Sequence, residues 1–458
     1  MNCFLAIDIG ASSGRHIAGF LERGKLRLEE IYRFKNQIIS SDDGLCWDTE
    51  YLFSQIVKGL CVCREKGVIP KSIAIDTWGV DYVLINENGN PILPVRAYRD
   101  PSNAEYARDF HSSVMSFEEL YKENGIQFQP FNSIYQLYGD LKSGKLSNAV
   151  RALMIPDYFS YRLSGVMKNE YTNATTAGIV SAQGAVISTR IMDKAGFPEC
   201  IFDALSLPCT TVGDLKDDIA RAVGFNCPVL LAPSHDTACA VAACPLDKDS
   251  IFLSSGTWSL IGCETDKPIC SADARLANFT NEGGIEYRNR FLKNIMGMWL
   301  LSEIRKELSH APSFDEMMEM ASKSGFIKIF DVNHPTLNAP ESMLDAVRGL
   351  IGIPDLPLDC TLSCVYHSLA SAYADSVKQI EALTNKRFTK IMIIGGGSKD
   401  TYLNRLTSKY TKKTVITGLP EATALGNILS QIMAYSGTDL NKARQTVKNS
   451  FDFKETRI

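Results

Sequence analysis

The sequence CFLAIDIGASSGRHIAGFL occupies residues 3–21, and a comparable stretch, IFLSSGTWSLIGC, occupies residues 251–263. Each consists of an apolar, β-rich segment, a short turn rich in Gly and Ser, and a second apolar segment. The letters differ, but both stretches predict a strand, a turn and a strand. A supersecondary unit that recurs about half-way along the chain predicts two related lobes.

Strand and helix patterns alternate outside these two hairpins. Short apolar runs end at polar residues, as strands of an α/β sheet do, and longer stretches repeat their apolar residues at helical spacing. We place the boundary between the lobes at residues 242/243, in a segment of Pro and charged residues. The predicted strands lie at residues 26–34, 73–76, 229–232 and 390–394, and the predicted helices lie at 49–66, at 361–383 and, as the last helix, from about 421 onward.

Composition narrows the possible partners. Of 458 residues, 45% are hydrophobic and 22% are charged, which is typical of a globular protein of more than one domain. The net charge is −4 without a basic run, so nucleic acid is not an expected partner. No apolar run reaches the roughly 18 residues of a membrane span, and no basic segment precedes the first apolar run. Thirteen cysteines favour a reducing compartment. We therefore expect a cytoplasmic protein, a monomer or small homo-oligomer.

Glycine-rich turns that follow strands are candidate phosphate sites, because backbone N–H groups can approach an anion there. The turn at residues 10–14 matches neither the dinucleotide fingerprint nor the P-loop, and an apolar alternating run follows it instead of a helix. Hydroxyls of Ser12 and Ser13 beside the cation of Arg15 would still suit a polyphosphate. The alternative is an ordinary tight hairpin.

Asp8 favours the phosphate interpretation. It stands two residues before Gly10, at a strand end, where a carboxylate could hold the Mg²⁺ that accompanies a nucleotide. The second hairpin offers small donors at residues 254–257, and Gly395–Gly397 provides a third backbone-lined turn. Three glycine-rich turns of this kind favour phosphate binding more strongly than one turn alone would.

Asp236 begins an apolar helix directly after a strand. It could cap that helix, or it could accept a proton from a substrate hydroxyl during phosphoryl transfer. Asp76 and Asp81 also follow a strand, and Gly79 between them would let backbone approach a sugar, although either acid could simply close a turn. Cys360, Cys364 and His367 share a helix face but lack a fourth zinc ligand, so packed thiols are the favoured interpretation. His16 is interpreted as a strand residue.

Taken together, these motifs resemble the FGGY carbohydrate kinases from the first strand to about Ala434. The stretches that carry the resemblance are DIGASSGR at residues 8–15, DTWGVD at 76–81, AYRD at 97–100, PDYFSYRLSG at 156–165, YTNATT at 171–176, SHDT at 234–237, SSGTWS at 254–259, LKNIMG at 292–297 and GGG at 395–397.

The resemblance implies an α/β fold of two ribonuclease-H-like domains of the actin/hexokinase type, with a cleft between them. Sugar would bind mostly to the domain of residues 1–242, and ATP mostly to that of residues 243–458. The reaction implied is transfer of the γ-phosphoryl group of ATP to the 1-hydroxyl of L-rhamnulose. The implied ATP-binding residues are Ala11, Ser12, Ser13, Gly14, Arg15, Thr257, Gly396 and Ser302; the sugar-binding residues are Gly79, His235, Asp236, Thr237 and Asn294; Asp236 is the base, and Asp8 holds Mg²⁺ through water.

Two questions remain open at this point. Ser302 stands where the family carries Gln, and its shorter side chain would need a water bridge to the nucleotide. The sugar is also undecided, because pocket geometry distinguishes L-rhamnulose from another ketose or polyol such as L-fuculose or L-xylulose. A catalytically silent ATP-binding sensor or an actin-like filament protein is the alternative from a different class.

Overall fold

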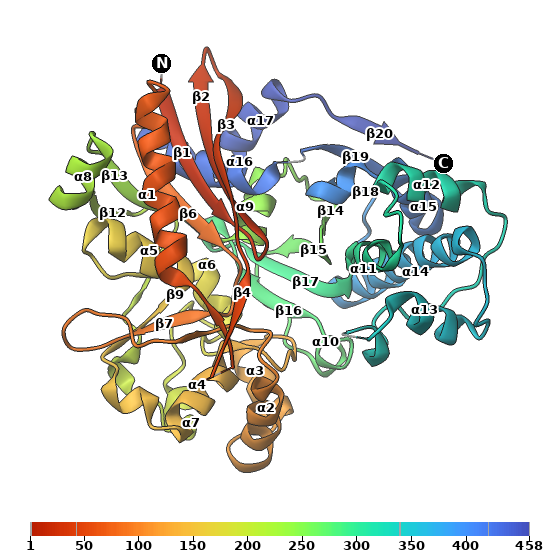
Figure 1. Cartoon of the computed structure of the whole chain (residues 1–458), viewed down its shortest axis with the longest axis horizontal. Coiled ribbons are helices and arrows are strands. Elements are labelled where there is room, and N and C mark those ends of the chain that lie inside the picture. Colours follow the sequence, from red (N-terminus) through yellow and green to blue (C-terminus); the bar gives the residue numbers. More distant parts are fainter. Residues whose placement is uncertain (1, 43, 339, 420, 458) are drawn as a thin grey trace. The chain divides into compact units, whose positions relative to one another are not determined.

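The computed structural model describes residues 2–42, 44–338, 340–419 and 421–457 (Figure 1). The chain forms two compact units, each built from separate segments. The first unit comprises residues 1–245, 265–291 and 422–450, and the second comprises residues 246–264, 292–421 and 451–458. In space, therefore, the chain does not divide at the single point 242/243, because two later segments return to the first unit.

The first unit is built on a six-stranded sheet in the order β12-β13-β6-β1-β2-β3. β1, β2 and β3 form an antiparallel meander, whereas β6 and β13 run parallel to β1. The strands are β1 (Asn2–Ile9), β2 (Ser13–Glu22), β3 (Lys25–Lys35), β6 (Ile73–Thr77), β12 (Thr211–Asp214) and β13 (Pro228–His235). The predicted first hairpin and the strands that follow it are confirmed.

The two faces of this sheet carry side chains of different size. Odd-numbered residues of β1, such as Leu5 and Ile7, pack with α1 (Thr49–Glu65) and α5 (Ile155–Ser164) in a large apolar core. On the opposite face, small residues such as Ala74 and Ala232 leave room for α9 (Asp236–Ala243) and α16 (Ala422–Ser436). Because strand side chains alternate, Asp8 and Asp76 lie on the face of α9 and α16.

A helical region with its own apolar core completes the first unit. Its elements surround the antiparallel pair β7 (Tyr82–Ile85) and β9 (Arg151–Met154). The remaining elements of the first unit are β4 (Ile38–Ser41), β5 (Gly44–Trp47), β8 (Val95–Arg96), α2 (Ser102–Ser113), α3 (Phe117–Asn124), α4 (Ser133–Lys142), β10 (Asn169–Glu170), α6 (Tyr171–Ala174), α7 (Thr189–Ala195), β11 (Leu205–Ser206), α8 (Asp217–Val223), α10 (Ala272–Leu276), β16 (Thr280–Gly283), the start of β17 (Asn289–Met296) and α17 (Leu440–Ser450).

The second unit repeats the plan of the first. Its strands follow the order β15-β14-β18-β19-β20, with an antiparallel hairpin beside parallel strands, as in β2-β1-β6. This confirms the predicted repeat. The elements are β14 (Ser250–Ser255), β15 (Trp258–Thr265), α11 (Trp299–Glu307), α12 (Phe314–Lys323), α13 (Met343–Ile351), α14 (Leu358–Thr384), β18 (Lys390–Ile394), α15 (Thr401–Thr411), β19 (Thr414–Leu419) and β20 (Lys454–Thr456).

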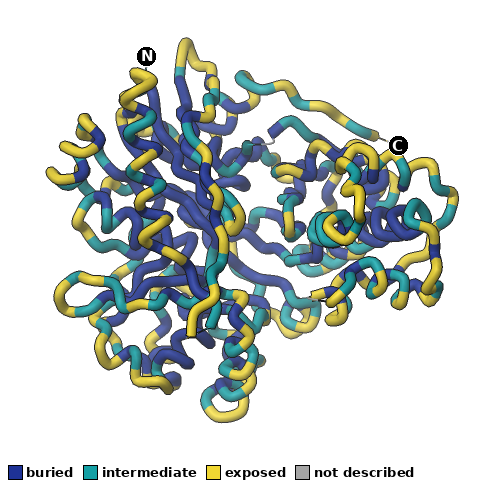
Figure 2. Tube along the Cα trace, in the orientation of Figure 1, coloured by how far each residue is buried: buried dark blue, intermediate teal, exposed yellow. Residues whose placement is uncertain are grey.

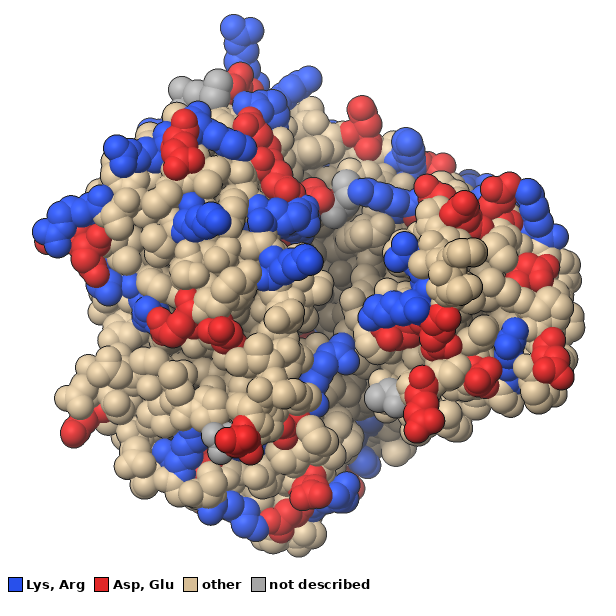
Figure 3. Space-filling model, viewed as in Figure 1, with Lys and Arg blue, Asp and Glu red and all other residues tan. Residues whose placement is uncertain are grey.

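The central strands of the sheets in both units are largely inaccessible to solvent (Figure 2). Acidic and basic side chains are intermixed over the face seen in Figure 3, in keeping with the small net charge. One sequence prediction is wrong: α16 is not the last helix, because α17 and β20 follow it. Leu440, Ala443, Arg444 and Val447 have the helical spacing that would have indicated α17.

Candidate active site

Three carboxylates lie at the carboxyl ends of three adjacent strands of the first unit. Asp8 lies near the end of β1, and Asp76 is its register partner on β6. Asp236 is the first residue after β13, the strand next to β6. Crevices at the carboxyl ends of parallel strands are the usual ligand sites of α/β sheets.

Asp8 forms an ion pair with Arg15, which faces it from the other strand of the hairpin. The atoms Arg15 Nη2 and Asp8 Oδ2 are 2.6 Å apart, and the two residues are register partners. Asp8 is almost fully buried. The predicted metal ligand and the predicted phosphate-binding cation therefore contact each other.

Asp76 is fully buried and accepts a hydrogen bond from Asn427 Nδ2 of α16 at 2.7 Å. Burial, and then the charge of Asp8, raise the pKa of Asp76 well above its ordinary value. Its other oxygen, Oδ1, has no hydrogen-bond partner among the described residues. Asp8 and Asp76 thus present carboxylate oxygens of the kind that hold a hard cation.

The turn between β1 and β2 is tight, and its shape is imposed by packing. Gly10 N donates to Ser13 O at 2.9 Å, while Ala11 and Ser12 are exposed. A Cβ at Gly14 would lie 2.1 Å from the ring of Phe34, so only glycine fits there. Ala11, Ser12 and Ser13 are accessible to a ligand, whereas Gly14 is needed for the hairpin itself.

Asp236 is not the N-cap of α9 but its first residue, since the N-cap position is occupied by His235. Its Oδ1 accepts a hydrogen bond from Thr237 Oγ1 at 3.0 Å and lies 3.4 Å from His235 Nε2. The side chain is 36% exposed, in contrast to Asp8 and Asp76. An accessible carboxylate with one oxygen held in place is well suited to accept a proton.

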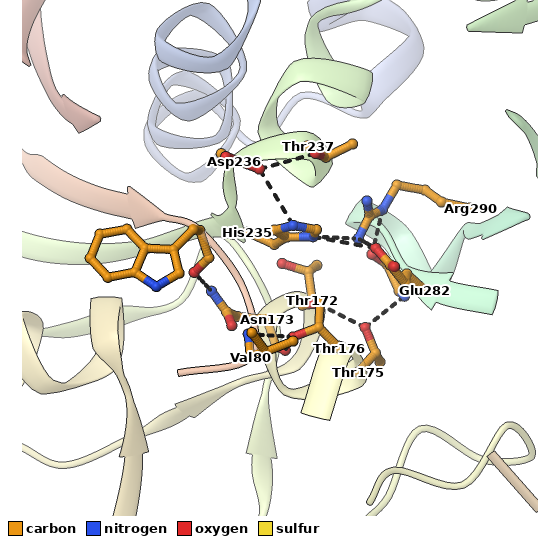
Figure 4. Close-up of polar contacts among 12 residues, drawn as sticks. Val80, Thr172, Asn173, Thr175, Thr176, His235, Asp236, Thr237, Glu282 and Arg290 are labelled. Atoms are coloured by element: carbon orange, nitrogen blue, oxygen red, sulfur yellow. Dashed lines mark hydrogen bonds and ion pairs between the residues drawn. The ribbon is translucent and has the colours of Figure 1, made fainter. Parts of the chain in front are cut away.

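Behind His235 lies a buried ion pair between Glu282 of β16 and Arg290 of β17 (Figure 4). Glu282 Oε2 is 3.1 Å from Arg290 Nη2 and 3.3 Å from His235 Nδ1. Burial alone would raise the pKa of Glu282, but the charge of Arg290 and the contact with His235 bring that pKa below its ordinary value. Both ring nitrogens of His235 therefore face carboxylates.

The helix α6 supports the ends of β6 and β13. Asn173 Nδ2 donates a hydrogen bond to Ser234 O at 3.2 Å and another to Trp78 O at 3.4 Å. Thr176 Oγ1 accepts a hydrogen bond from Val80 N at 3.1 Å. A Cβ at Gly79 would lie 2.9 Å from that same oxygen, which explains why glycine stands at this position.

In the second unit, the predicted nucleotide residues gather at the ends of β14 and β18. Thr257 is exposed in the β14–β15 turn, and Met298 N, just before α11, donates to Gly256 O. Gly395 and Gly397 pack on Ser255, whereas a Cβ at Gly396 would meet nothing within 4 Å. Ser302 lies in α11, one turn beyond Met298. The backbone around Gly396 is thus open to a ligand.

Comparison with known proteins identifies the family. The model of the FGGY family of carbohydrate kinases, N-terminal domain, matches residues 3–243, and the model of the C-terminal domain matches residues 251–435. The chain belongs to the FGGY family of carbohydrate kinases. It is therefore a carbohydrate kinase with ATP as its second substrate.

Full-length relatives of this FGGY kinase include two rhamnulokinases. That of Halalkalibacterium halodurans is 43% identical over 99% of this chain and 98% of its own length. That of Bacillus subtilis is 36% identical over 98% of this chain and 94% of its own.

Solved structures of other sugar kinases share the fold. They include a xylulose kinase from Lactobacillus acidophilus, with a TM-score of 0.83 and 15% identity over 100% of this chain and 94% of its own. A Plasmodium falciparum glycerol kinase with ADP has a TM-score of 0.77 and 13% identity, and the match covers 99% of this chain and 94% of the glycerol kinase. The expected pair of actin/hexokinase-type domains is confirmed.

The structure of this FGGY kinase shows the surroundings of two further candidates from the sequence, Asp81 and Asn294. Asp81 is fully buried and accepts hydrogen bonds from Trp47, Trp78, Gln136 and the backbone of Tyr98, so it supports the fold around Trp78. Asn294 lies in the second unit, and its buried Oδ1 has no hydrogen-bond partner among the described residues.

His367, His16 and the cysteines of this FGGY kinase have contacts that fit a structural role. His367 Nδ1 lies 2.7 Å from the hydroxyl of Tyr410, and His16 Nε2 lies 3.1 Å from Ile56 O inside the sheet. None of the thirteen cysteines forms a disulfide, and eight of them are buried. Within the described ranges, no helix has the length and apolar character of a membrane span.

Sequence reasoning missed Glu282, Arg290, Asn173 and Asn427. Each is a polar residue inside an apolar or turn-forming segment, and each acquires its role through partners on other elements, which for Asn427 and Asp76 are 351 residues apart. Arg290 shares the strand NRFLKNIM with Lys293 and two asparagines, so its charge alone gave no signal of a buried partner.

Proposed function

We propose that this FGGY kinase transfers the γ-phosphoryl group of ATP to O1 of L-rhamnulose, giving L-rhamnulose 1-phosphate and ADP. The names of the full-length relatives support the choice of sugar. The observation that carries the chemistry is the position of Asp236, accessible and anchored at the strand ends beside Asp8 and Asp76.

Asp236 acts as the general base. Its carboxylate accepts the proton of the 1-hydroxyl while that oxygen bonds to the γ-phosphorus, and the bond from the γ-phosphorus to the bridging oxygen of ADP breaks. The proposed sugar-binding residues are Gly79, His235, Asp236, Thr237 and Asn294. His235 and Thr237 stand directly beside the base.

The proposed ATP-binding residues are Ala11, Ser12, Ser13, Gly14, Arg15, Thr257, Gly396 and Ser302. Ser302 reaches the nucleotide through water. Mg²⁺ would be held by Asp8 through water, with Asp76 beside it, and would neutralise developing phosphate charge when bound. Because no group of three or more His, Cys, Asp or Glu among the described residues forms a metal cage, phosphates and water would supply most ligands.

We infer a cytoplasmic location, since reducing conditions keep cysteines out of disulfides, as all thirteen are here.

An activity screen tests the proposed substrate. ADP release is measured with purified protein, ATP and a panel of ketoses that includes L-rhamnulose, L-fuculose and L-xylulose. We expect the highest kcat/KM with L-rhamnulose, and the absence of turnover with this sugar would refute the specific claim.

A single substitution tests the base. Asp236→Asn keeps the shape of the side chain but cannot accept the proton, so kcat should fall by about 10²- to 10⁴-fold. ATP binding, measured by calorimetry, should persist because the proposed phosphate contacts lie elsewhere. A fully active Asn variant would overturn the assigned role.

A further inference from the structure

β13 contains a bulge directly before the proposed base, Asp236. Beyond Leu231, β13 next pairs with β6 only at His235, four residues later, whereas β6 has advanced by two residues. Residues 232–234 have no register partner among the described residues of β6. A bulge beside a ligand site redirects the chain, and its backbone groups must find partners outside the ladder. The contacts that hold this bulge therefore determine where Asp236 lies.

The carboxylate of Glu170 holds this bulge. Glu170 is fully buried and accepts two hydrogen bonds from Ser234, one from its backbone N at 3.1 Å and one from its Oγ at 2.7 Å. Ser234 O accepts from Asn173 Nδ2 at 3.2 Å. Pro233 has no N–H group, and its carbonyl oxygen accepts from Cys239 Sγ at 3.0 Å. The backbone polar groups of residues 233 and 234 thus have partners without the ladder.

The same carboxylate fixes the start of α6. Glu170 is the N-cap of this helix, and its oxygens accept from Thr172 N at 2.8 Å, Thr172 Oγ1 at 2.7 Å and Asn173 N at 3.0 Å. Glu170 N donates to Asp157 Oδ2 at 3.1 Å, so its backbone is anchored as well. Burial raises the pKa of Glu170, and the hydrogen bonds that it accepts oppose this rise. A carboxylate with five donors has one well-defined position.

We propose that Glu170 is a positioning residue that fixes the bulge of β13 and thereby holds Asp236 in place for proton transfer. Through Ser234 it anchors the residue two places before the base. Through Asn173 it anchors the helix whose side chain donates to Trp78 O, beside the end of β6. The inference rests on the proposed function, because the effect assigned to Glu170 on the reaction is exerted through the base.

Hydrogen exchange of the ligand-free protein tests whether Glu170 fixes the bulge. Glu170→Gln keeps the size of the side chain, but the new amide nitrogen is a donor and must face groups that are donors themselves. We expect the amides of a peptide covering residues 232–238 to exchange roughly 10-fold faster, as on loss of a hydrogen bond to a charged group. A peptide covering residues 3–9 of β1 should change less. No acceleration at 232–238, or equal acceleration in both peptides, would overturn the proposal.

Kinetics in two backgrounds test whether Glu170 acts through Asp236. For the best ketose of the panel, Glu170→Gln should lower kcat roughly 10- to 100-fold with KM for ATP unchanged, since a misplacement of about 1 Å can have effects of this size. In an Asp236→Asn protein, which has no base to misplace, the same substitution should have little further effect. Equal fold losses in both backgrounds would indicate general destabilisation and refute the positioning role.

The two measurements also separate this inference from the proposed function. If no ketose of the panel is turned over, or if Asp236→Asn is fully active, the proposed function fails. The exchange measurement needs neither sugar nor ATP, so it still decides whether Glu170 fixes the bulge.

Two further variants separate positioning from folding. Glu381→Gln makes the same chemical change near the start of β18, at a carboxylate that is only 9% exposed and also accepts several hydrogen bonds. It should leave kcat unchanged. Ser234→Ala removes one donor from Glu170 and keeps the other, the Ser234 amide. It should fold, speed exchange at residues 232–238 and lower kcat roughly 3- to 10-fold. If Glu170→Gln does not fold, parent-like exchange and kcat in Ser234→Ala would refute the proposal.

Discussion

The carboxylate of Asp81 is fully buried, and burial raises its pKa to about 6 despite the hydrogen bonds that it accepts. An unfolded aspartate has a pKa near 4. Between about pH 4 and pH 6 the native protein therefore binds the proton more tightly than the unfolded chain does. The contribution of Asp81 to the free energy of unfolding falls as pH rises through this window, and it is constant above it.

Asp81→Asn should remove this pH dependence. At pH 7.5 we expect a loss of about 1–3 kcal/mol in the free energy of unfolding, because the new amide group cannot accept from Gln136 Nε2. At pH 4.5 the loss should be larger by about 2 kcal/mol, since the parent protein gains stability there. Urea unfolding at both pH values measures the two differences. The exposed Asp214→Asn serves as control, and a loss independent of pH would contradict the prediction.

At the scale of residues, the sequence indicated candidate site residues where a polar residue stands at the end of a predicted strand. Asp8 and Asp236 could be chosen as candidates because each comes at the end of an apolar run, where the carboxyl ends of parallel strands usually hold ligands. Asp81 could not be separated from them, because only the structure shows that two indole groups occupy its oxygen. Glu282 and Arg290 could not be paired, because the sequence does not show that the strands that carry them, β16 and β17, are neighbours.

At the scale of elements, α16 packs unusually close to α9. A Cβ at Gly426 would lie 1.8 Å from Cys239 O, a backbone atom that cannot move without shifting α9. α9 begins with the proposed base, and α16 carries Asn427, which binds Asp76. The small residue at 426 therefore sets the distance between two helices that border the site.

Gly426→Ala should destabilise the protein by about 3 kcal/mol, since overpacking against backbone forces the helices apart. Gly349→Ala in α13 is the matched control, because nothing lies within 4 Å of its Cβ and alanine favours a helix. The control should be neutral or slightly stabilising. Thermal unfolding compares the two, and equal midpoints would show that the helix contact is not tight.

The elements themselves were predicted well where apolar periodicity is strong, as in the two hairpins and in α14. α17 was overlooked because charged and amide residues surround its four buried positions. β20, with the sequence KET, has no apolar pattern at all, and its pairing with β19 is a consequence of tertiary structure. Edge strands of this kind carry little local signal.

At the scale of the whole molecule, the first unit depends on a segment from the far end of the chain. α16 contributes buried side chains such as Leu425, Ile428 and Leu429, and its Gln431 Nε2 donates to Leu5 O of β1 at 2.9 Å. Two lobes could be predicted from the repeated hairpins. The return of residues 422–450 could not, because no local pattern records which sheet a helix covers.

Two truncations test this dependence. A chain that ends at residue 421 lacks α16 and α17, so one face of the first sheet would be exposed to water and the first unit should lose its fixed tertiary structure. A chain that ends at residue 450 lacks only β20 and its flanks and should retain that structure. Near-UV circular dichroism and thermal unfolding distinguish them. A cooperative transition of parent size in the shorter chain would contradict the prediction.

The long-range bond between Asn427 and Asp76 also has a consequence for biosynthesis. Residue 422 leaves the ribosome 177 residues after residue 245, the end of the first segment of this unit (422 − 245 = 177). At roughly 5–20 residues per second, that interval lasts about 9–35 s. During it, α9 is present but α16 is not, so the apolar surface of β1, β6 and β13 that α16 covers in the finished protein stays exposed to water.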